Sequence, residues 1–370
     1  MSRDPSLERS SSEASSFVTE KLPHTNNVIR GQENVYSVGR KIASGRYGAV
    51  YEVLRRGDGK HFAAKLEVSD THFHGLNMDY NVLKEANKAK LAHFCQLIDR
   101  GKIEGHFKFM IMQMLGPNLD KLRQEFQANR FSAPTALRLG LEMLSALEEI
   151  HSIGFVHRDV KPSNFAVNYE MGEWNVYMID FGLCRQYKSK NGDIKPARDQ
   201  VQFRGTQRYA SLNAHNGIEQ SPRDDLESWF YVLVEFLTGE LPWSIYKKRE
   251  REMAKKAKEL ARTSEGTAEL LQYCPRTEFR RIMKYIDGLG YLSHPDYTFL
   301  RDLIQLAMKN NDIKADQLFD WEYESEESDG EAIEGSSKNP EDTTVAMNGL
   351  CDKLDRMVQT VNGKDNGNPA

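Results

Sequence analysis

The chain has 370 residues, of which 39% are hydrophobic and 28% charged, enough to bury the core of one large or two ordinary domains. It contains no run of eighteen apolar residues and no apolar N-terminal segment, so we expect neither a membrane partner nor a signal peptide. Its four cysteines lie far apart without a Cys-x-x-Cys pair, which argues against a disulfide framework and a zinc site. We therefore expect a reducing compartment, the cytoplasm or the nucleus.

Charge is distributed unevenly along the chain. Residues 1–30 carry four basic and four acidic groups, and seven of the first sixteen residues are Ser, which predicts a disordered N-terminal tail. Residues 320–370 carry four basic and thirteen acidic groups, which predicts an acidic, disordered C-terminal tail. The remaining part, 31–319, has a net charge of +5, because the whole chain has −4. A mildly basic domain suits phosphate chemistry but falls short of a nucleic-acid-binding stripe, so we expect no nucleic-acid partner.

The first part of the domain reads as strands with one helical interval. The glycines of residues 56–60 predict a hairpin turn between two apolar, strand-like stretches. Apolar residues at helical spacing predict a helix over about residues 76–91, and the dense apolar run 107–115 predicts a buried strand.

The part after Gly116 is predicted to be mainly helical. Residues 135–151 place their apolar side chains on one helical face, with Pro134 at the helix start, and residues 225–239 predict a buried helix. Residues 247–262 are charged nearly all round, which favours a solvated helix; a phosphate-binding or nuclear-import patch is the alternative interpretation.

A glycine-containing loop joins two strand-like stretches at Ile42-Ala43-Ser44-Gly45-Arg46-Tyr47-Gly48-Ala49-Val50. Glycines allow backbone N–H groups to lie close to phosphates. Ala43 stands where a Gly-x-Gly-x-x-Gly loop has its first glycine, and a plain β-hairpin would look the same. The position of the loop ahead of Lys65 favours a nucleotide-binding loop.

Lys65 lies in the strand-like segment that follows this loop. A lysine directed toward bound phosphates needs a carboxylate from a nearby helix to hold it. Asp79 and Glu85 are the two candidates, and six residues apart they point to different helix faces. Asp79 lies beside the apolar face and is preferred, although its shorter side chain requires a closer approach of the helix.

The most informative motif is His157-Arg158-Asp159-Val160-Lys161-Pro162-Ser163-Asn164, followed by Asp180-Phe181-Gly182. Phosphoryl transfer from ATP needs a carboxylate that receives the substrate hydroxyl and oxygen ligands that hold Mg²⁺ against the phosphates. The motif supplies Asp159 as the acceptor, Lys161 as a cation for the transferring phosphoryl group, and Asn164 and Asp180 as metal ligands. A lysine at position 161 is typical of Ser/Thr kinases, so we predict a protein-kinase catalytic loop.

These motifs resemble the eukaryotic protein-kinase superfamily over about residues 33–310. The segments 115–119, 205–215 and 224–228 resemble the casein kinase 1 family, and no Ala-Pro-Glu occurs in the chain. Residues 192–198 and 203–206, together with Leu76-Asn77-Met78-Asp79, are most similar to the tau-tubulin kinase branch.

The resemblance implies an α+β, bilobal protein-kinase fold with a small β-rich N-lobe to about residue 116 and a larger helical C-lobe. It implies ATP and Mg²⁺ as cofactors, a hinge at about residues 113–115, and Asp225 as a buried anchor of the catalytic-loop backbone. The residues expected to bind or position the nucleotide are Ile42, Ala43, Ser44, Gly45, Gly48, Val50, Ala63, Lys65, Asp79, Met112, Gln113 and Leu115.

The resemblance also implies acidic or already phosphorylated protein substrates. Arg208 matches the position where such kinases bind an anion, and Lys195, Arg198 and Arg204 would extend that patch. The alternative is that Arg158 and Arg208 pair with local carboxylates.

The sequence thus predicts a monomeric Ser/Thr protein kinase acting on protein substrates. A pseudokinase scaffold is the main alternative, because Ala43 and Asp79 depart from the usual pattern; a small-molecule phosphotransferase is a lesser one. Ser325 and Ser328 lie among carboxylates in a tail read as solubilising, with self-phosphorylation or inhibition as the alternative. Cys184 is interpreted as an inert core thiol.

Overall fold

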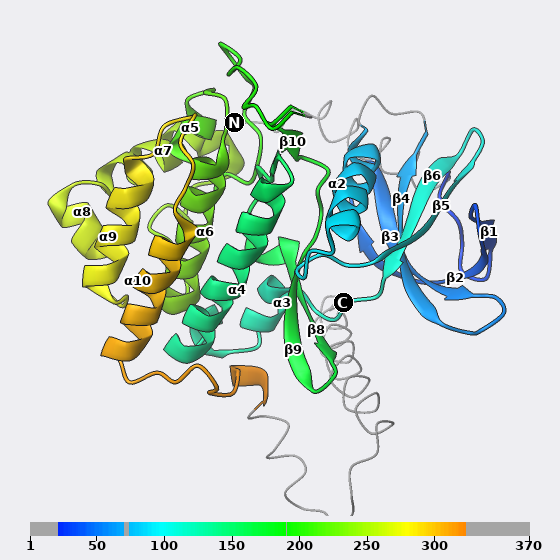
Figure 1. Cartoon of the computed structure of the whole chain (residues 1–370), viewed down its shortest axis with the longest axis horizontal. Helices are drawn as coiled ribbons and strands as arrows, with labels where there is room; N and C mark the ends of the chain where they lie inside the picture. The colour runs from blue at the N-terminus through cyan, green and yellow to red at the C-terminus, as the bar shows by residue number, and fades with distance from the viewer. Residues whose placement is uncertain (1–20, 70–73, 190, 323–370) are drawn as a thin grey trace, which may run out of the picture.

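The computed structural model describes residues 21–69, 74–189 and 191–322. A β-rich N-terminal part and a helical C-terminal part lie side by side, with α2 (Gly75–Ala89) beside the sheet (Figure 1). The sheet is antiparallel with the order β1-β2-β3-β4-β6-β5. Its strands are β1 (Val28–Arg30), β2 (Val35–Ser44), β3 (Gly48–Arg55), β4 (His61–Val68), β5 (Leu97–Ile103) and β6 (Phe107–Gln113).

The C-terminal part has two short two-stranded sheets besides its helices; β8 and β9 of one of them can be followed in Figure 1. The strands are β7 (Phe155–Val156) paired with β10 (Arg185–Gln186), and β8 (Phe165–Glu170) paired with β9 (Glu173–Met178). The helices are α3 (Leu119–Arg123), α4 (Ala133–Ser152), α5 (Leu212–His215), α6 (Pro222–Thr238), α7 (Arg251–Leu260), α8 (Ser264–Leu270), α9 (Arg276–Asp287) and α10 (Tyr297–Asn310), with 3-10 turns at Gln127–Asn129, Pro162–Asn164 and Lys248–Glu250. These elements agree with the predicted α+β kinase fold. In the described ranges no helix has the length and apolar character needed to span a membrane.

The predicted hairpin joins β3 and β4. Gly57 and Gly59 adopt positive φ values of 124° and 69°, and Arg55 donates to Asp58 across the turn. The register places Val50 opposite Lys65, and β4 pairs on its other side with β6, so Lys65 lies in a central strand. Lys65 is therefore not on an edge strand of the sheet.

The two longest helices, α4 and α6, form the centre of the helical part. Ser132 caps α4 by accepting a hydrogen bond from the Thr135 amide, and α6 starts with a capping box between Ser221 and Asp224. The helices pack closely at Gly140, where an added Cβ would lie 2.9 Å from the Leu233 side chain. Nearly every residue of α6 is buried, as its apolar sequence predicts.

The apolar side chains form two clusters rather than one. The smaller cluster lies within the sheet, whereas the larger runs from α2 through the whole helical part. Phe181 belongs to the larger cluster, and its ring lies 5.5 Å from that of Phe94 and 5.8 Å from that of His157. The helix that carries Asp79 is thus packed into the same core as the catalytic motifs.

The folded part extends beyond both predicted boundaries. Strand β1 pairs with β2, and Leu22 and Ile29 are buried, so residues 21–30 belong to the fold although they were assigned to the disordered tail. At the other end Trp321 is buried, and Asp320 accepts hydrogen bonds from the backbone of Ser132 and the side chain of Thr135. Composition alone did not indicate that these short segments are folded, since each contributes only a few apolar residues to the core. The rest of both predicted tails, including Ser325 and Ser328, lies outside the described residues.

Candidate active site

Three side chains hold Asp159 of the catalytic loop, two through its carboxylate and one through its backbone carbonyl. Its Oδ1 accepts a hydrogen bond from the Thr206 hydroxyl at 2.7 Å, and its Oδ2 lies 2.8 Å from Lys161 Nζ. Asn164 donates its amide N–H to the Asp159 carbonyl at 2.8 Å. The segment that carries Thr206 approaches the loop at Gly205, where an added Cβ would lie 2.7 Å from the Arg158 carbonyl oxygen. The structure therefore brings together Asp159, Lys161 and Asn164 as the sequence predicts.

Asp225 supports this loop from below. It is 1% exposed and accepts hydrogen bonds from the backbone amides of His157 at 2.6 Å and Arg158 at 2.8 Å, and from His151 Nε2 at 2.8 Å. Burial alone would raise the pKa of Asp225, but the hydrogen bond and charge of His151 lower it below its usual range. Arg158 has a φ of 65°, which is uncommon for a non-glycine residue, and two of these bonds hold the backbone there. The anchor role expected for Asp225 is confirmed.

Lys65 joins the sheet, α2 and the Asp-Phe-Gly motif. Its Nζ lies 2.8 Å from Asp79 Oδ2 and 2.7 Å from Asp180 Oδ1. The other oxygen of Asp79 accepts a hydrogen bond from the Phe181 amide at 2.7 Å, whereas Glu85 is exposed. Asp79 is thus the partner of Lys65, and the close approach that its short side chain requires is visible at Gly182. An added Cβ there would lie 3.5 Å from Gly75 Cα at the start of α2.

The ion triad perturbs the pKa of each member. Burial raises the pKa of Asp79 above its usual range, although Lys65 opposes this shift. The charge of Lys65 lowers the pKa of Asp180 to about 2, so this carboxylate stays ionised at any physiological pH. Burial alone would lower the pKa of Lys65, but the charges of Asp79 and Asp180 raise it above its usual range. Lys65 is therefore a cation at neutral pH.

The predicted metal ligands fit a hard cation that is also held by phosphates. Asp180 is 51% exposed, and Asn164 uses its amide nitrogen for the Asp159 carbonyl, which leaves its oxygen as the ligand atom. Mg²⁺ prefers oxygen ligands and is commonly bound by one or two protein groups plus substrate phosphates. No group of three or more His, Cys, Asp or Glu side chains suited to a metal occurs in the part of the chain that the structure describes.

Several predicted nucleotide contacts share the sheet face of Lys65. Val50 lies opposite Lys65, and Ala63, two residues before Lys65 on the same strand, lies opposite Met112. Residues directly opposite one another share a face of the sheet, so these four side chains line the same surface. Leu115 and Gln113 follow at the end of β6 and are half-buried.

The glycine-containing loop is a turn between β2 and β3 and is largely exposed at Ile42, Ala43, Ser44 and Gly45. The Gly45 amide donates to the Gly48 carbonyl at 2.8 Å, which closes the turn. An added Cβ at Gly48 would lie 1.8 Å from the Leu66 carbonyl oxygen, so this glycine is required by strand packing. At Gly45 the nearest such atom is 3.8 Å away, which leaves its backbone accessible to a ligand.

Three of the four cations predicted to form an anion patch have partners within the chain. Arg208 pairs with the buried Glu235 at 3.0 Å, Arg198 donates to Glu219, and Lys195 donates to the backbone and side chain of Gln186. Arg204 is exposed, and the described residues offer its side chain no partner. For Arg208 the alternative prediction, pairing with a local carboxylate, is the one that the structure shows. The two residues of such a pair are close in space but far apart in the sequence, so no short sequence motif predicts the pairing.

A different cationic cluster was missed. Arg185 lies 3.4 Å from the buried carboxylate of Glu219, which also accepts from Arg198, and the guanidinium of Arg158 is close enough to feel all three charges. Arg158 itself donates to the carbonyls of Leu183 and Cys184 rather than to a carboxylate. Two guanidinium groups therefore pair with one carboxylate, and the positive charge of Arg158 lies near them beside the catalytic loop. In the sequence, the position of Arg185 three residues after Gly182 could have indicated a cation beside the catalytic loop.

Lys258 was also missed, because α7 was predicted to be solvated all round. The side chain is fully buried; its Nζ donates to the Gln207 carbonyl at 2.9 Å and to the Ala210 carbonyl. Burial lowers the pKa of Lys258 to about 7. The lysine thereby holds the segment that carries Thr206, so its role is positional rather than solubilising. Cys184 is buried as expected, and burial raises the pKa of its thiol well above the usual value.

Comparison with known proteins agrees with this geometry. The sequence model of the family described as "Protein kinase domain" matches residues 36–310. A protein from Dictyostelium discoideum, named as a probable serine/threonine-protein kinase, is 34% identical over 302 residues, which cover 81% of this chain. The aligned region spans 58% of that relative's length. The chain belongs to the protein kinase family.

Proposed function

We propose that the chain is an ATP- and Mg²⁺-dependent serine/threonine protein kinase of casein kinase 1 type, close to the tau-tubulin kinase branch. The observation that carries the proposal is the joint assembly of two groups. Asp159 is held by Lys161 and Thr206, while Lys65 contacts both Asp79 and Asp180. The relative named as a serine/threonine-protein kinase supports the same class.

Each residue has a distinct task in this proposal. Bound ATP supplies the phosphoryl group, and Mg²⁺ neutralises charge on its phosphates. Lys65 binds the phosphates, and Asp79 keeps its ammonium group in place. Asp180 and the side-chain oxygen of Asn164 would hold the metal. Asp159 orients the substrate hydroxyl and accepts its proton late in the transfer, while Lys161 stabilises charge on the transferring group.

The substrate class is proposed from the cluster of Arg158, Arg185 and Arg198 around Glu219. One carboxylate leaves two of the three positive charges uncompensated, beside the loop that carries Asp159. Guanidinium groups bind phosphate and carboxylate oxygens through paired hydrogen bonds. A phosphorylated or acidic residue in the substrate would therefore bind here, which replaces the patch centred on Arg208.

A pseudokinase scaffold is the alternative. Its sequence argument was that Asp79 and Ala43 depart from the kinase pattern. The Lys65–Asp79 distance of 2.8 Å shows that the shorter carboxylate still reaches its lysine, which favours turnover.

Transfer of labelled phosphate from ATP to casein, with Mg²⁺, tests the activity. We expect the wild-type protein to transfer phosphate and Asp159→Asn to lose at least about a hundredfold in rate, the usual contribution of a positioned base. ATP binding without any transfer by the wild-type protein would favour the scaffold.

A matched pair of acidic peptides, with and without a prior phosphate, tests the substrate class. Arg185→Ala is expected to raise KM for the phosphorylated peptide more than for the unphosphorylated one. The exposed Arg280→Ala is the control and should change neither value. Equal losses on both peptides would remove the anion-binding role of the cluster.

A further inference from the structure

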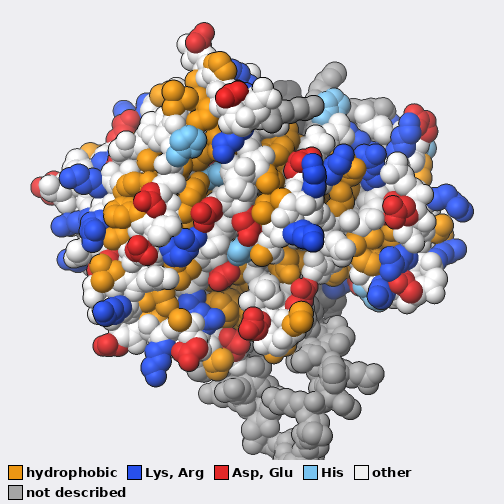
Figure 2. Space-filling model, viewed as in Figure 1, with side chains coloured by type: hydrophobic (Ala, Val, Ile, Leu, Met, Phe, Trp, Pro, Cys, Tyr) orange, Lys and Arg blue, Asp and Glu red, His pale blue; other side chains and the backbone are white. Residues whose placement is uncertain are grey.

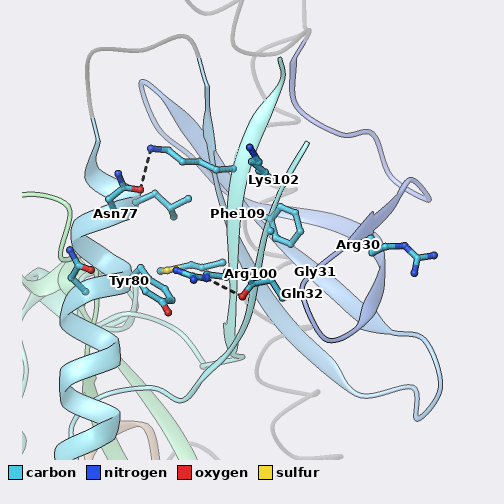
Figure 3. A pocket seen from close by; sticks show the side chains of 13 residues that line it. Arg30, Gly31, Gln32, Asn77, Tyr80, Arg100, Lys102 and Phe109 are labelled. Atoms are coloured by element: carbon cyan, nitrogen blue, oxygen red, sulfur yellow. Dashed lines mark hydrogen bonds between the residues drawn. The ribbon is translucent and has the colours of Figure 1, made fainter. Parts of the chain in front are cut away.

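A groove of about 640 Å³ lies outside the site described above, between α2 and the strands β1, β5 and β6 (Figure 3). Residues from α2 and from the strand edges face each other across it (Figure 3). Its lining comes from residues 30–32, the start of α2, β5 and β6. None of the functions assigned so far uses this groove.

The floor of the groove is apolar. Leu76, Phe109 and Met110 are buried, and Tyr80 is half-buried. Gly101 allows the Phe109 ring to reach the floor, because an added Cβ would lie 2.4 Å from that ring. The groove therefore offers an apolar base on which an extended peptide can lie.

The rim is positively charged. Four lining residues are Lys or Arg and none is Asp or Glu. The guanidinium of Arg100 lies 4.4 Å from the Tyr80 ring and donates to the side-chain oxygen of Gln32, so its charge meets no carboxylate in the described ranges. Figure 2 shows Lys and Arg side chains gathered over the region of α2 and the strands beside it.

The other charges of the rim are only partly compensated. Lys108 lies 3.0 Å from Glu67 and donates to Asn77, while Lys102 pairs with Glu104 in full exposure to solvent, where an ion pair is weak. Arg30 extends away from the groove and is exposed (Figure 3). The groove therefore keeps positive charge that an acidic ligand can neutralise.

The chain itself contains a segment of complementary charge. Residues 323–342 follow directly on the last described residue and carry eight carboxylates and one lysine. Twenty extended residues span about 65 Å. A folded domain of 300 residues has a radius of gyration of about 19 Å, hence a diameter near 50 Å. The segment is therefore long enough to pass from the helical part to the sheet.

We propose that residues 323–342 bind in the groove between α2 and β5–β6, with their carboxylates on Arg100, Lys102 and Lys108. The groove wall includes Asn77 and Tyr80, which flank Asp79 on α2. Binding there contacts the helix whose Asp79 holds Lys65, so the tail is linked to the nucleotide side of the active site. The proposal does not depend on catalytic turnover.

Zero-length carbodiimide cross-linking of the full chain at low ionic strength tests this contact, because it joins a carboxylate only to an adjacent amine. We expect amide links from residues 324–342 to Lys102 and Lys108, read by mass spectrometry of the digested protein. Raising NaCl to about 0.5 M, where the Debye length falls below 5 Å, is expected to reduce these links several-fold.

Charge reversal next to the two lysines tests the groove itself. Arg100→Glu keeps both lysines available for cross-linking and is expected to reduce the links at least threefold. Arg30→Glu is expected to give a smaller reduction, and it does not remove the contact of Arg100 with Tyr80. Arg280→Glu makes the same charge change elsewhere and should leave the links unchanged. Thermal melts check that each variant folds. If Arg100→Glu does not fold, the salt series and Arg30→Glu test the contact instead.

Three results would overturn the proposal. The first is the absence of links to the groove lysines. The second is a set of links that goes mainly to lysines of the helical part, such as Lys247 or Lys255. The third is a set of links between ¹⁵N-labelled and unlabelled chains in a mixture, which would make a second copy of the chain the occupant.

Discussion

The two sides of Asp159 use charge in opposite ways. On the nucleotide side, Lys65, Asp79 and Asp180 come from three different segments and pair with one another, and Asp180 is 51% exposed. On the support side, Asp225 is 1% exposed, and its oxygens accept hydrogen bonds from two backbone amides and from a histidine of the same lobe. The first arrangement holds groups that a ligand can reach, whereas the second fixes the shape of the loop.

This difference separates the costs of mutation. Removing a buried charge costs several kcal/mol of stability, because its partners are left buried without a hydrogen-bond or ion-pair partner. A partly exposed charge costs little stability, because water replaces its partner. Nucleotide-side variants should therefore fail in function, and support-side variants should fail in folding.

Asp225→Ala should give the largest loss of stability. His151 and the amides of His157 and Arg158 would lose their acceptor in a buried site, and the strained backbone of Arg158 would lose its restraint. We expect the free energy of unfolding to fall by about 3–5 kcal/mol, measured by urea denaturation. A fall of less than about 1 kcal/mol would break the comparison, since Asp225 would then behave like a surface charge.

Asp180→Ala should show the reverse. Lys65 keeps Asp79 as a partner, so the loss of stability should stay below about 1 kcal/mol. Phosphate transfer should fall about a hundredfold or more, since a metal that neutralises phosphoryl charge contributes several kcal/mol to the transition state. Transfer close to the wild-type rate would show that the metal is held elsewhere.

Lys258 tests the support side through pH. Burial lowers its pKa to about 7 in the folded chain, whereas an unfolded lysine titrates near 10.5. Between these values the unfolded state binds the extra proton, so stability rises with pH, and below pH 7 this dependence ends. We expect the stability of the wild-type protein relative to Lys258→Met to increase by about 2 kcal/mol from pH 6.5 to 8.5.

Urea denaturation of both proteins at the two pH values measures that increase. His215, Glu227 and Arg262 also face Lys258, but they are present in both proteins and largely cancel in the difference. A difference that stays flat with pH would mean that Lys258 keeps its proton in the folded chain. The lysine would then hold the Gln207 and Ala210 carbonyls as a cation.

The sequence carried the local parts of the site. Asp159, Lys161, Asn164 and Asp180 lie in short motifs whose spacing is set by one loop and one strand end, so chain order alone indicates their roles. The choice of Asp79 rested on helical spacing, which is also local. Turn glycines likewise predicted the β3–β4 hairpin, and apolar residues at helical spacing predicted the helix α4.

The parts that sequence could not supply depend on contacts between distant segments. Glu219 meets Arg185 and Arg198 only after the chain has folded, and nothing near Arg208 in sequence indicates Glu235. Lys258 looks like a solvated residue, because its burial comes from Trp243, Tyr231 and the carbonyls of another loop. Charge alone does not distinguish a surface lysine from a buried one when its partners are neutral.

Asp79→Ala and Glu85→Ala form the most sensitive test of the comparison, because they change the same kind of group on the same helix. Asp79→Ala leaves Lys65 with Asp180 alone and the Phe181 amide without its acceptor. We expect ATP to bind about tenfold more weakly, which corresponds to roughly 1.4 kcal/mol. Glu85→Ala should leave ATP affinity unchanged, since that side chain is exposed.

Binding of a fluorescent ATP analogue measures both variants under the same conditions. If Asp79→Ala instead unfolds the protein while ATP affinity of the remaining folded fraction is normal, Asp79 belongs with Asp225 on the support side. Its burial at 1% and its raised pKa already place it between the two classes. The Asp79 carboxylate thus has two roles at once: it positions Lys65 for the nucleotide, and it stabilises the fold.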